Sequence, residues 1–210
     1  MNAKTAFYKH LNKVFYPKII DLGFKGRDQL FRRVRGELVD VINIQDALQD
    51  ANCCIKLGLH ISFFPVVWSS LKFVDPNKLR VDDCEYQKYL APDNQSEYWW
   101  FFDGGGSGGS PDASVSHIID TYLNIGEPSF QQFQNIQDLL NALTDNKIKE
   151  NEVFEVFGEV FPARAALIAS RIYKHLGDNS RASEQAKIGI SKLGHTVEAR
   201  NELEELAELK

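Results

Sequence analysis

The sequence predicts an α+β fold, in which an antiparallel sheet of about four strands is packed by helices and followed by a C-terminal helical unit. Segments in which apolar and polar residues alternate lie between residues 30 and 102, as expected of strands. Segments with apolar residues every three or four positions follow them. Because strands come first and helices later, the order disfavours a doubly wound parallel sheet. We expect an α+β domain over residues 1–160 and a three-helix unit over residues 163–210.

The first predicted element is a one-sided helix over residues 7–22. Its apolar residues recur at steps of three and four. Pro17 lies inside this run and is expected to kink or restart the helix. Gly23 follows the last periodic residue, as glycines that end helices commonly do.

Four strands are predicted next, over residues 30–34, 38–45, 53–63 and 97–102. The third has the clearest alternation in the chain, with one apolar face and one mixed face that carries Lys56 and His60. We expect Arg35-Gly36-Glu37 to form the turn between the first two strands. Trp99 and Trp100 point to opposite faces of the fourth strand, so one enters the core and the other is exposed or lies beneath a helix.

Helices are predicted for the rest of the chain. Ser114 and Ser129 are the expected caps of two helices that run to about residues 126 and 143. Residues 152–161 indicate a short amphipathic helix that Pro162 ends. The tail is expected to form three helices, over residues 163–176, 180–193 and 196–209.

Composition excludes several protein classes. The chain has 210 residues, 43% of them hydrophobic, and a formal net charge of −5. A chain of this kind can bury a core, so the disordered and collagen-like classes are excluded. Residues 1–40 carry a net charge of +5 and the remainder −10. The basic start indicates either an anionic partner or internal pairing with the acidic part.

The cysteines and the hydropathy pattern favour a cytoplasmic protein. No segment has the apolar stretch of a signal peptide or the ~20 apolar residues of a membrane helix. Cys53, Cys54 and Cys84 form no CxxC pair, so neither a zinc site nor a disulfide framework is indicated. We therefore expect no metal, no cofactor and no membrane contact.

Two segments resemble known families. The motifs Gly23-Phe24-Lys25, Leu30-Phe31-Arg32-Arg33, Val41-Ile42-Asn43-Ile44-Gln45 and Ile55-Lys56-Leu57-Gly58 together resemble the bacterial domain-of-unknown-function family numbered 4304, over about residues 5–145. Lys56 stands where that family's pattern has an Asn-like residue. The resemblance implies a fold context and a bacterial origin, but no activity.

The tail is similar to a single tetratricopeptide (TPR) hairpin. Tyr173 falls at the aromatic position of that repeat, Gly177 at its turn, and Ala182 and Ala186 at small-residue positions of its second helix. A three-helix appendage without repeat character is the alternative reading of the same residues.

The glycine-rich loop from Asp103 to Pro111 matches two catalytic motifs by letter, GxGxxG and GxSxG. Five glycines in six positions make such matches nearly automatic. A dinucleotide site needs its last glycine in the first turn of a helix that leads to another parallel strand, and here Ser110-Pro111-Asp112 intervene. We interpret the segment as a surface loop.

A polar patch on the sheet is the best candidate site. If the first three strands pair as a meander, one face carries Arg33, Asn43, Gln45, Lys56 and His60, with Trp99 as a possible exposed neighbour. No acidic partner of His60 is identifiable, so no catalytic residue is assigned. The alternatives are a solvated face or one covered by helices.

We therefore expect a non-catalytic module that binds another protein, for example an immunity or adaptor protein. The acidic segments 138–159 and 198–208 suggest a basic partner. The alternative is a small-molecule binder or enzyme that uses the polar face around His60. Nucleic acid is disfavoured because the N-terminal lysines are dispersed and the pI is about 5.6. A closed pocket on the face would favour the alternative, and a flat open sheet the binding module.

Overall fold

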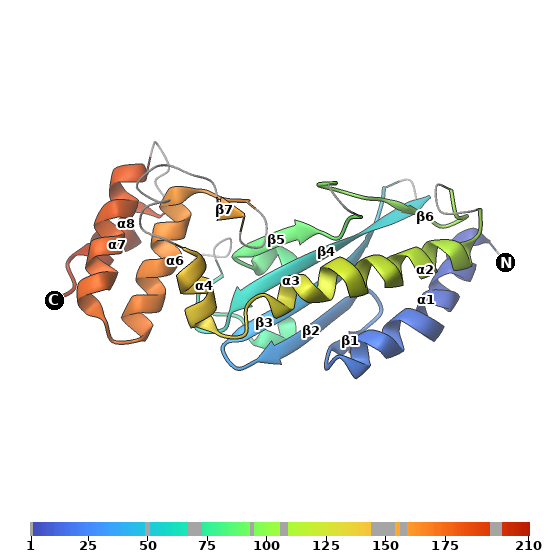
Figure 1. The fold of residues 1–210 in the computed structure, drawn as a ribbon, viewed down its shortest axis with the longest axis horizontal. Helices are drawn as coiled ribbons and strands as arrows, with labels where there is room; N and C mark the ends of the chain where they lie inside the picture. The colour runs from blue at the N-terminus through green and yellow to red at the C-terminus, as the bar shows by residue number, and fades with distance from the viewer. Residues whose placement is uncertain are drawn as a thin grey trace. The chain divides into compact units, whose positions relative to one another are not determined.

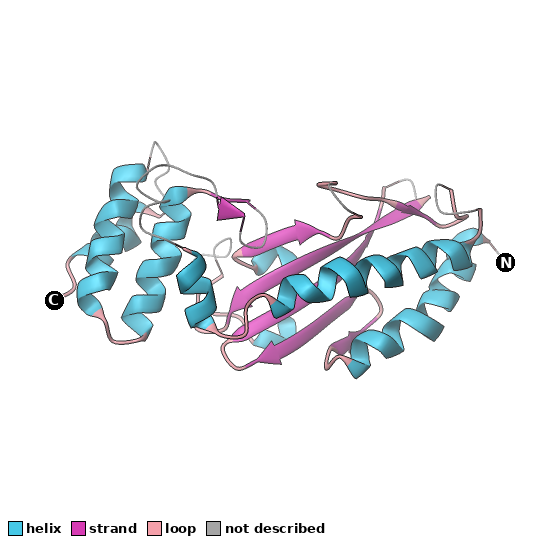
Figure 2. Ribbon diagram, in the orientation of Figure 1, coloured by secondary structure: helices cyan, strands magenta, loops and turns pink. Residues whose placement is uncertain are grey.

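The chain folds as two compact units, Met1–Gln134 and Asn135–Lys210. The computed structural model describes residues 2–48, 51–66, 73–92, 95–105, 109–143, 154–155, 159–193 and 199–210. Figure 1 shows the course of the chain, and Figure 2 its helices and strands. The sequence predicted this boundary near residue 160. Residues 135–160 therefore belong to the second unit in the structure and to the first domain in the prediction.

The first unit is α+β and contains an antiparallel sheet, as predicted. Within the described residues six strands form it, where about four were expected: β1 (Lys25–Arg27), β2 (Leu30–Arg35), β3 (Leu38–Asp46), β4 (Asn52–Ile61), β5 (Tyr86–Tyr89) and β6 (Trp100–Phe101). Their order is β1-β2-β3-β4-β5, and β6 also pairs with β4. The two additional strands, β1 and β5, are three and four residues long, too short to show an alternation that sequence analysis can recognise.

The register of the sheet assigns each side chain to a face. Phe31, Ile42 and Leu57 lie opposite one another on β2, β3 and β4, and all three are buried. Tyr16 of the first helix contacts Phe31, so this is the face that the helices cover. On the other face, the cluster around Val39 and Val41 is covered by residues from the segment between β4 and β5, namely Val66, Leu79, Val81 and Cys84. Two short 3-10 helices lie in that segment, η1 (Pro76–Lys78) and η2 (Val81–Asp83).

The first helix, α1 (Ala3–Asp21), buries its apolar stripe against the sheet. It runs through Pro17 as one assigned helix, without the restart that the sequence analysis allowed. Gly23 ends it as predicted, with φ at +93°, a backbone conformation that side chains with a Cβ rarely adopt. The amides of Gly23 and Phe24 donate to the carbonyls of Ile20 and Ile19, so the helix ends in a Schellman motif.

The second helical segment begins earlier than predicted and has no break at Ser129. It consists of α2 (Pro111–Thr121), the π-helical turn η3 (Tyr122–Gly126) and α3 (Glu127–Gln131). Ser110 is the N-cap, because its Oγ accepts from the amide of Ala113 and Pro111 suits the first helical position. Ser114 and Ser129 donate instead to the carbonyls of Phe101 and Ile125. The predicted caps were therefore wrong.

The second unit is mainly helical, with α4 (Ile136–Ala142), α6 (Pro162–His175), α7 (Asn179–Lys192) and α8 (Arg200–Ala207). The three predicted tail helices are confirmed, although residues 194–198 at the start of the third lie outside the described residues. Where a helix was expected over residues 152–161, β7 (Phe154–Glu155) pairs with β8 (Glu159–Val160). Valines and phenylalanines on both sides of Gly158 favour a hairpin there.

We expect Gly58→Ala to destabilise the first unit. A Cβ at Gly58 would lie 2.7 Å from Cys84 Sγ and 3.3 Å from the backbone of Val81, which covers β4. Overpacking of this kind costs about 1–3 kcal/mol in the free energy of unfolding. The measurement is urea denaturation followed by circular dichroism. Adding Cys84→Ala should recover part of the loss, and an equal or greater loss in the double variant would contradict this packing.

Candidate functional site

The polar residues predicted on β3 and β4 lie together on one face of the sheet. Asn43 is directly opposite Lys56, and Lys56 is opposite Tyr89 of β5. The Lys56 Nζ lies 5.1 Å from the centre of the Tyr89 ring, within range of a cation–π contact. Gln45 is opposite Cys54, one step further along the same face, and is exposed.

Aromatic side chains from β6 and the residue before it extend this face. Trp100 is opposite Cys53 and fully buried on the helix side, where its Nε1 donates to His117 Nδ1 over 3.3 Å. Its neighbours Trp99 and Phe101 therefore belong to the other face. Phe101 is 41% exposed, and Trp99 is half-buried, with its Nε1 donating to Glu97. We call the following set the open sheet patch: Asn43, Gln45, Lys56, Tyr89, Trp99 and Phe101.

His60 shares the face but not the patch, because residues between β4 and β5 cover it. Its side chain is 1% exposed, and its Nδ1 lies 2.8 Å from Glu85 Oε2, although without the alignment of a hydrogen bond. The same carboxylate oxygen accepts from the amide of Ile61. The sequence analysis identified no acidic partner for His60. Glu85 lies 25 residues further along the chain, in a segment whose hydrophobic pattern fits neither a helix nor a strand clearly. The sequence near His60 therefore gave no indication that Glu85 is its neighbour.

Arg33 was predicted on the polar face and lies on the opposite one. It pairs with Asp40, whereas Leu30 is the β2 residue opposite Asn43. The cause is the length of the turn. A turn of three residues, 35–37, would align Val34 with Leu38, but the structure pairs Arg35 with Leu38 and leaves only Gly36 and Glu37 to turn. A register shift of one residue moves every side chain of a strand to the other face.

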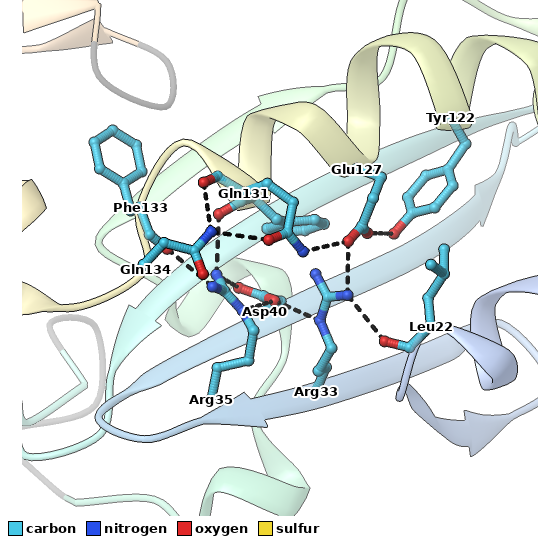
Figure 3. Close-up of polar contacts among 10 residues, drawn as sticks. Leu22, Arg33, Arg35, Asp40, Tyr122, Glu127, Gln131, Phe133 and Gln134 are labelled. Carbon is cyan, nitrogen blue, oxygen red and sulfur yellow. Dashed lines mark hydrogen bonds and ion pairs between the residues drawn. The ribbon is translucent and has the colours of Figure 1, made fainter.

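Arg33 and Arg35 meet the buried carboxylate of Asp40 beneath the helices (Figure 3). Arg33 Nε donates to Asp40 Oδ2 over 2.8 Å, and Arg35 donates to both carboxylate oxygens, over 2.7 and 2.9 Å. Asp40 is completely buried. Arg33 also donates to Glu127 Oε1 over 2.8 Å, and its guanidinium carbon lies 4.3 Å from the centre of the Phe24 ring.

The two arginines also bind the carboxyl ends of helices. Arg33 donates to the carbonyl of Leu22 at the end of α1, over 2.9 Å. Arg35 donates to the carbonyls of Phe130 and Phe133, over 3.0 and 2.9 Å, at the end of α3. Carbonyls at a helix end lack partners within the helix and carry partial negative charge, so a guanidinium stabilises them.

The π-helical turn places Glu127 in this network. Pro128 has no amide proton to donate to the preceding turn, and the wider turn η3 removes the need for that bond. Tyr122 and Glu127, five residues apart, then face each other, and the phenol donates to Glu127 Oε2 over 2.8 Å. Burial would by itself raise the pKa of Glu127, but hydrogen bonds from Arg33, Gln131 and Tyr122 outweigh it and hold that pKa below its usual value of 4.5. These contacts anchor α3 to the sheet.

Other groups offer little reactive chemistry. Within the ranges that the structure describes, no cluster of three or more His, Cys, Asp or Glu side chains could hold a metal ion. Cys53, Cys54 and Cys84 are free thiols and all are buried. Burial raises the pKa of Cys54 to about 11 and also raises the pKa of Cys53, so both thiols stay protonated near neutral pH. No helix in the described part of the chain is long and apolar enough to cross a membrane.

A family model for the domain of unknown function DUF4304 matches residues 15–128. The chain belongs to this family. The matched segment contains all six strands of the sheet and all four charged residues of the buried network, and it ends directly after Glu127. No curated protein and no solved structure matches the chain.

We expect Asp40→Ala to be strongly destabilising. The variant leaves two guanidinium groups buried without their shared carboxylate, and breaking a buried ion pair in this way costs about 3–5 kcal/mol. Urea denaturation gives the change in free energy of unfolding. Glu204→Ala, which removes the exposed pair of Glu204 with Arg200, is the matched control and should change it by less than about 1 kcal/mol. Similar losses in the two variants would show that the network is not the anchor. If Asp40→Ala does not fold, Asp40→Asn allows the same comparison.

The lowered pKa of Glu127 predicts a pH-dependent stability. A carboxyl group with a lowered pKa in the folded state stabilises the fold above its unfolded pKa, and the contribution is lost as the pH falls through the folded value. The wild type should therefore be more stable than Glu127→Gln at pH 6, and the difference should shrink as the pH falls below about 4.5. Denaturation curves at a series of pH values test this, and a difference that does not change with pH would contradict it.

Proposed function

We propose that this chain is a non-catalytic module that binds another protein through the open sheet patch. One observation carries the proposal: three aromatic side chains, two amides and a lysine share one face of the sheet, where Gln45 and Phe101 are exposed and the other four are half-buried. Tyr, Trp and Phe are enriched in protein interfaces, and Trp and Tyr among the residues that contribute most of the binding energy. Rigid aromatic side chains on paired strands lose little conformational entropy on binding.

The burial of His60 favours binding over the alternative, a small-molecule binder or enzyme centred on that residue. A general acid or base has to come within hydrogen-bond reach of its substrate. His60 and Glu85 each have a side chain only 1% exposed, so a substrate would first have to displace the segment that covers them. The open sheet patch contains no histidine and no carboxylate among its six residues.

One version of the proposal is an immunity or adaptor protein with a basic partner. Glu202 of α8 pairs with Arg171 over 2.5 Å. Glu204 and Glu205 of the same helix, and Glu208 at its C-cap, are exposed. Carboxylates spaced three and four residues apart lie on one side of a helix and attract a basic surface. Most of the other acidic segment, residues 138–159, lies outside the described residues.

The proposal also includes a bacterial origin with a cytoplasmic location, a TPR-like hairpin in the second unit, and a partner other than nucleic acid. The family resemblance and the free, buried cysteines support a bacterial, cytoplasmic protein. A TPR-like hairpin over α6 and α7 is supported by Gly177 between the two helices and by the complete burial of Ala182 and Ala186. The net charge of −5 disfavours nucleic acid as the partner.

Affinity capture with a matched pair of variants tests the patch. Phe101→Ala removes a patch residue that is 41% exposed, and Leu123→Ala removes a side chain outside the patch that is 43% exposed. We expect the wild type and Leu123→Ala to retain the same stoichiometric protein from a native lysate, and Phe101→Ala to bind it at least about tenfold more weakly, as for a loss of 1.4 kcal/mol or more.

Identification of the captured protein by mass spectrometry, followed by titration with the purified partner, gives the affinities. The absence of a stoichiometric partner, or equal affinities in the two variants, would overturn the patch as the binding surface. Co-expression with neighbouring genes tests the immunity version, which requires that one of them is toxic and that this chain suppresses the toxicity.

A further inference from the structure

The outer edge of β5 presents backbone donors and acceptors away from the sheet. The amide of Leu90, directly after β5, donates to the carbonyl of Ile55, its counterpart in the register of β4 and β5. Because hydrogen bonding alternates along an antiparallel pair, the backbone groups of Lys88 also point to β4, and those of Gln87 and Tyr89 point away from it. No described residue forms a hydrogen bond with the backbone of Gln87 or Tyr89. We call these outward backbone groups the β5 edge.

The other edges of the sheet are less suited to receive a strand. At β6, which pairs with the same side of β4, the carbonyl of Phe101 already accepts from Ser114 Oγ over 2.7 Å and from the amide of Gly104 over 3.1 Å. At the opposite edge, β1 is three residues long and exposes Lys25 and Arg27. Short length and charged side chains protect an edge strand from pairing. A further strand therefore fits best beside β5 (Figure 1).

The side chains of β5 determine what such a strand contacts. Gln87 and Tyr89 lie on the face of the open sheet patch, so an added strand continues that patch. Lys88 points to the face that the helices cover, is half-buried, and donates from Nζ to Ser129 Oγ over 2.8 Å. This hydroxyl carries no charge, and burial lowers the pKa of Lys88 below its usual value. A carboxylate opposite Lys88 on the next strand would therefore be stabilising.

The same lysine disfavours pairing between two copies of this chain. Two β5 strands that each use the outward groups of Gln87 and Tyr89 place one Lys88 directly opposite the other. Like charges in that position destabilise a sheet, and a lysine on an edge strand is a common protection against self-association. An acidic strand from another protein meets no such repulsion.

We propose that the β5 edge binds an extended acidic segment of another protein as an additional strand of the sheet. The backbone of Gln87 and Tyr89 supplies hydrogen bonds that do not depend on the sequence of the segment, and Lys88 selects Asp or Glu at the position opposite it. This mode of binding rests on the proposed function, because the added strand extends the open sheet patch at Tyr89.

Titration of the full-length, ¹⁵N-labelled chain with a synthetic peptide tests the proposal. The probe is acetyl-Ser-Thr-Val-Glu-Val-Thr-Ser-amide, whose valines lie opposite Gln87 and Tyr89 when its glutamate lies opposite Lys88. We expect saturable shifts centred on residues 86–89, with a Kd below about 1 mM. The bound peptide should slow hydrogen exchange of the Gln87 and Tyr89 amides at least about tenfold, and that of Lys88, already bonded to β4, by less than about twofold.

Two modified peptides and two variants separate strand addition from non-specific contact. N-methylation of both valines removes the donors that pair with β5 and should weaken binding at least about tenfold. Replacement of the glutamate by lysine should weaken it at least about threefold. Lys88→Gln should abolish this preference for glutamate. Lys25→Gln, which removes an exposed lysine from the edge strand on the other side of the sheet, should leave it unchanged.

The proposal is wrong if no saturable shifts occur up to about 2 mM peptide, if they centre on another surface, or if the N-methylated peptide binds equally well. A dimer of the chain alone that Gln87→Pro abolishes would also overturn it, by identifying a second copy as the occupant. Thermal unfolding shows whether each variant keeps its fold. Affinity capture distinguishes failure of this mode from failure of the proposed function: a captured protein that depends on Phe101, without peptide binding at β5, would support the patch and reject strand addition.

Discussion

The carboxylate of Asp40 is the acceptor on which the arrangement of the first unit depends. It is completely buried and receives hydrogen bonds from both Arg33 and Arg35. A charge in such a place is tolerated only when it is paired and its remaining lone pairs are satisfied. The same two guanidinium groups extend to carbonyls at the ends of α1 and α3. Since those helix ends and the strands share one set of donors, neither helix end can shift over the sheet without losing hydrogen bonds to these guanidinium groups.

This constraint also determines which face of the sheet can carry function. One face is occupied by helices and by the charged network, whose donors and acceptors are mostly used internally. On the other face, Leu79, Val81 and Cys84 cover the part that contains His60, and the open sheet patch is the part that remains. The proposed binding surface is therefore the part of the sheet whose side chains are not engaged in the core or in the charged network. The polar and aromatic character of that patch follows from the alternation of strands whose other face is the apolar core.

The sequence predicted those features that local patterns determine, such as the alternation of side chains along a strand. It did not predict features that depend on the exact length of a turn or on a partner far along the chain. Asn43, Gln45 and Lys56 share a face because alternation along β3 and β4 is regular. Arg33 was misplaced because a turn of two residues, rather than three, reversed the faces of β2. Glu85 has no local signal that links it to His60, and Tyr89 and Phe101 joined the patch through pairings that their short strands did not reveal. The hairpin at β7 and β8 was read as a helix because its valines and phenylalanines fit either period.

The charge distribution also acquires a structural explanation. Among the basic residues of the first forty positions, Arg33 and Arg35 are neutralised by Asp40 and Glu127, and Lys4 pairs with Asp46 over 3.0 Å. Arg32 donates to the carbonyl of Leu79 and holds the segment that covers His60. Part of the basic excess is thus engaged in contacts within the fold. The open sheet patch accordingly presents one lysine among aromatic and amide side chains. Such a surface lacks the clustered positive charge of a polyanion site, which supports the proposed protein partner over nucleic acid.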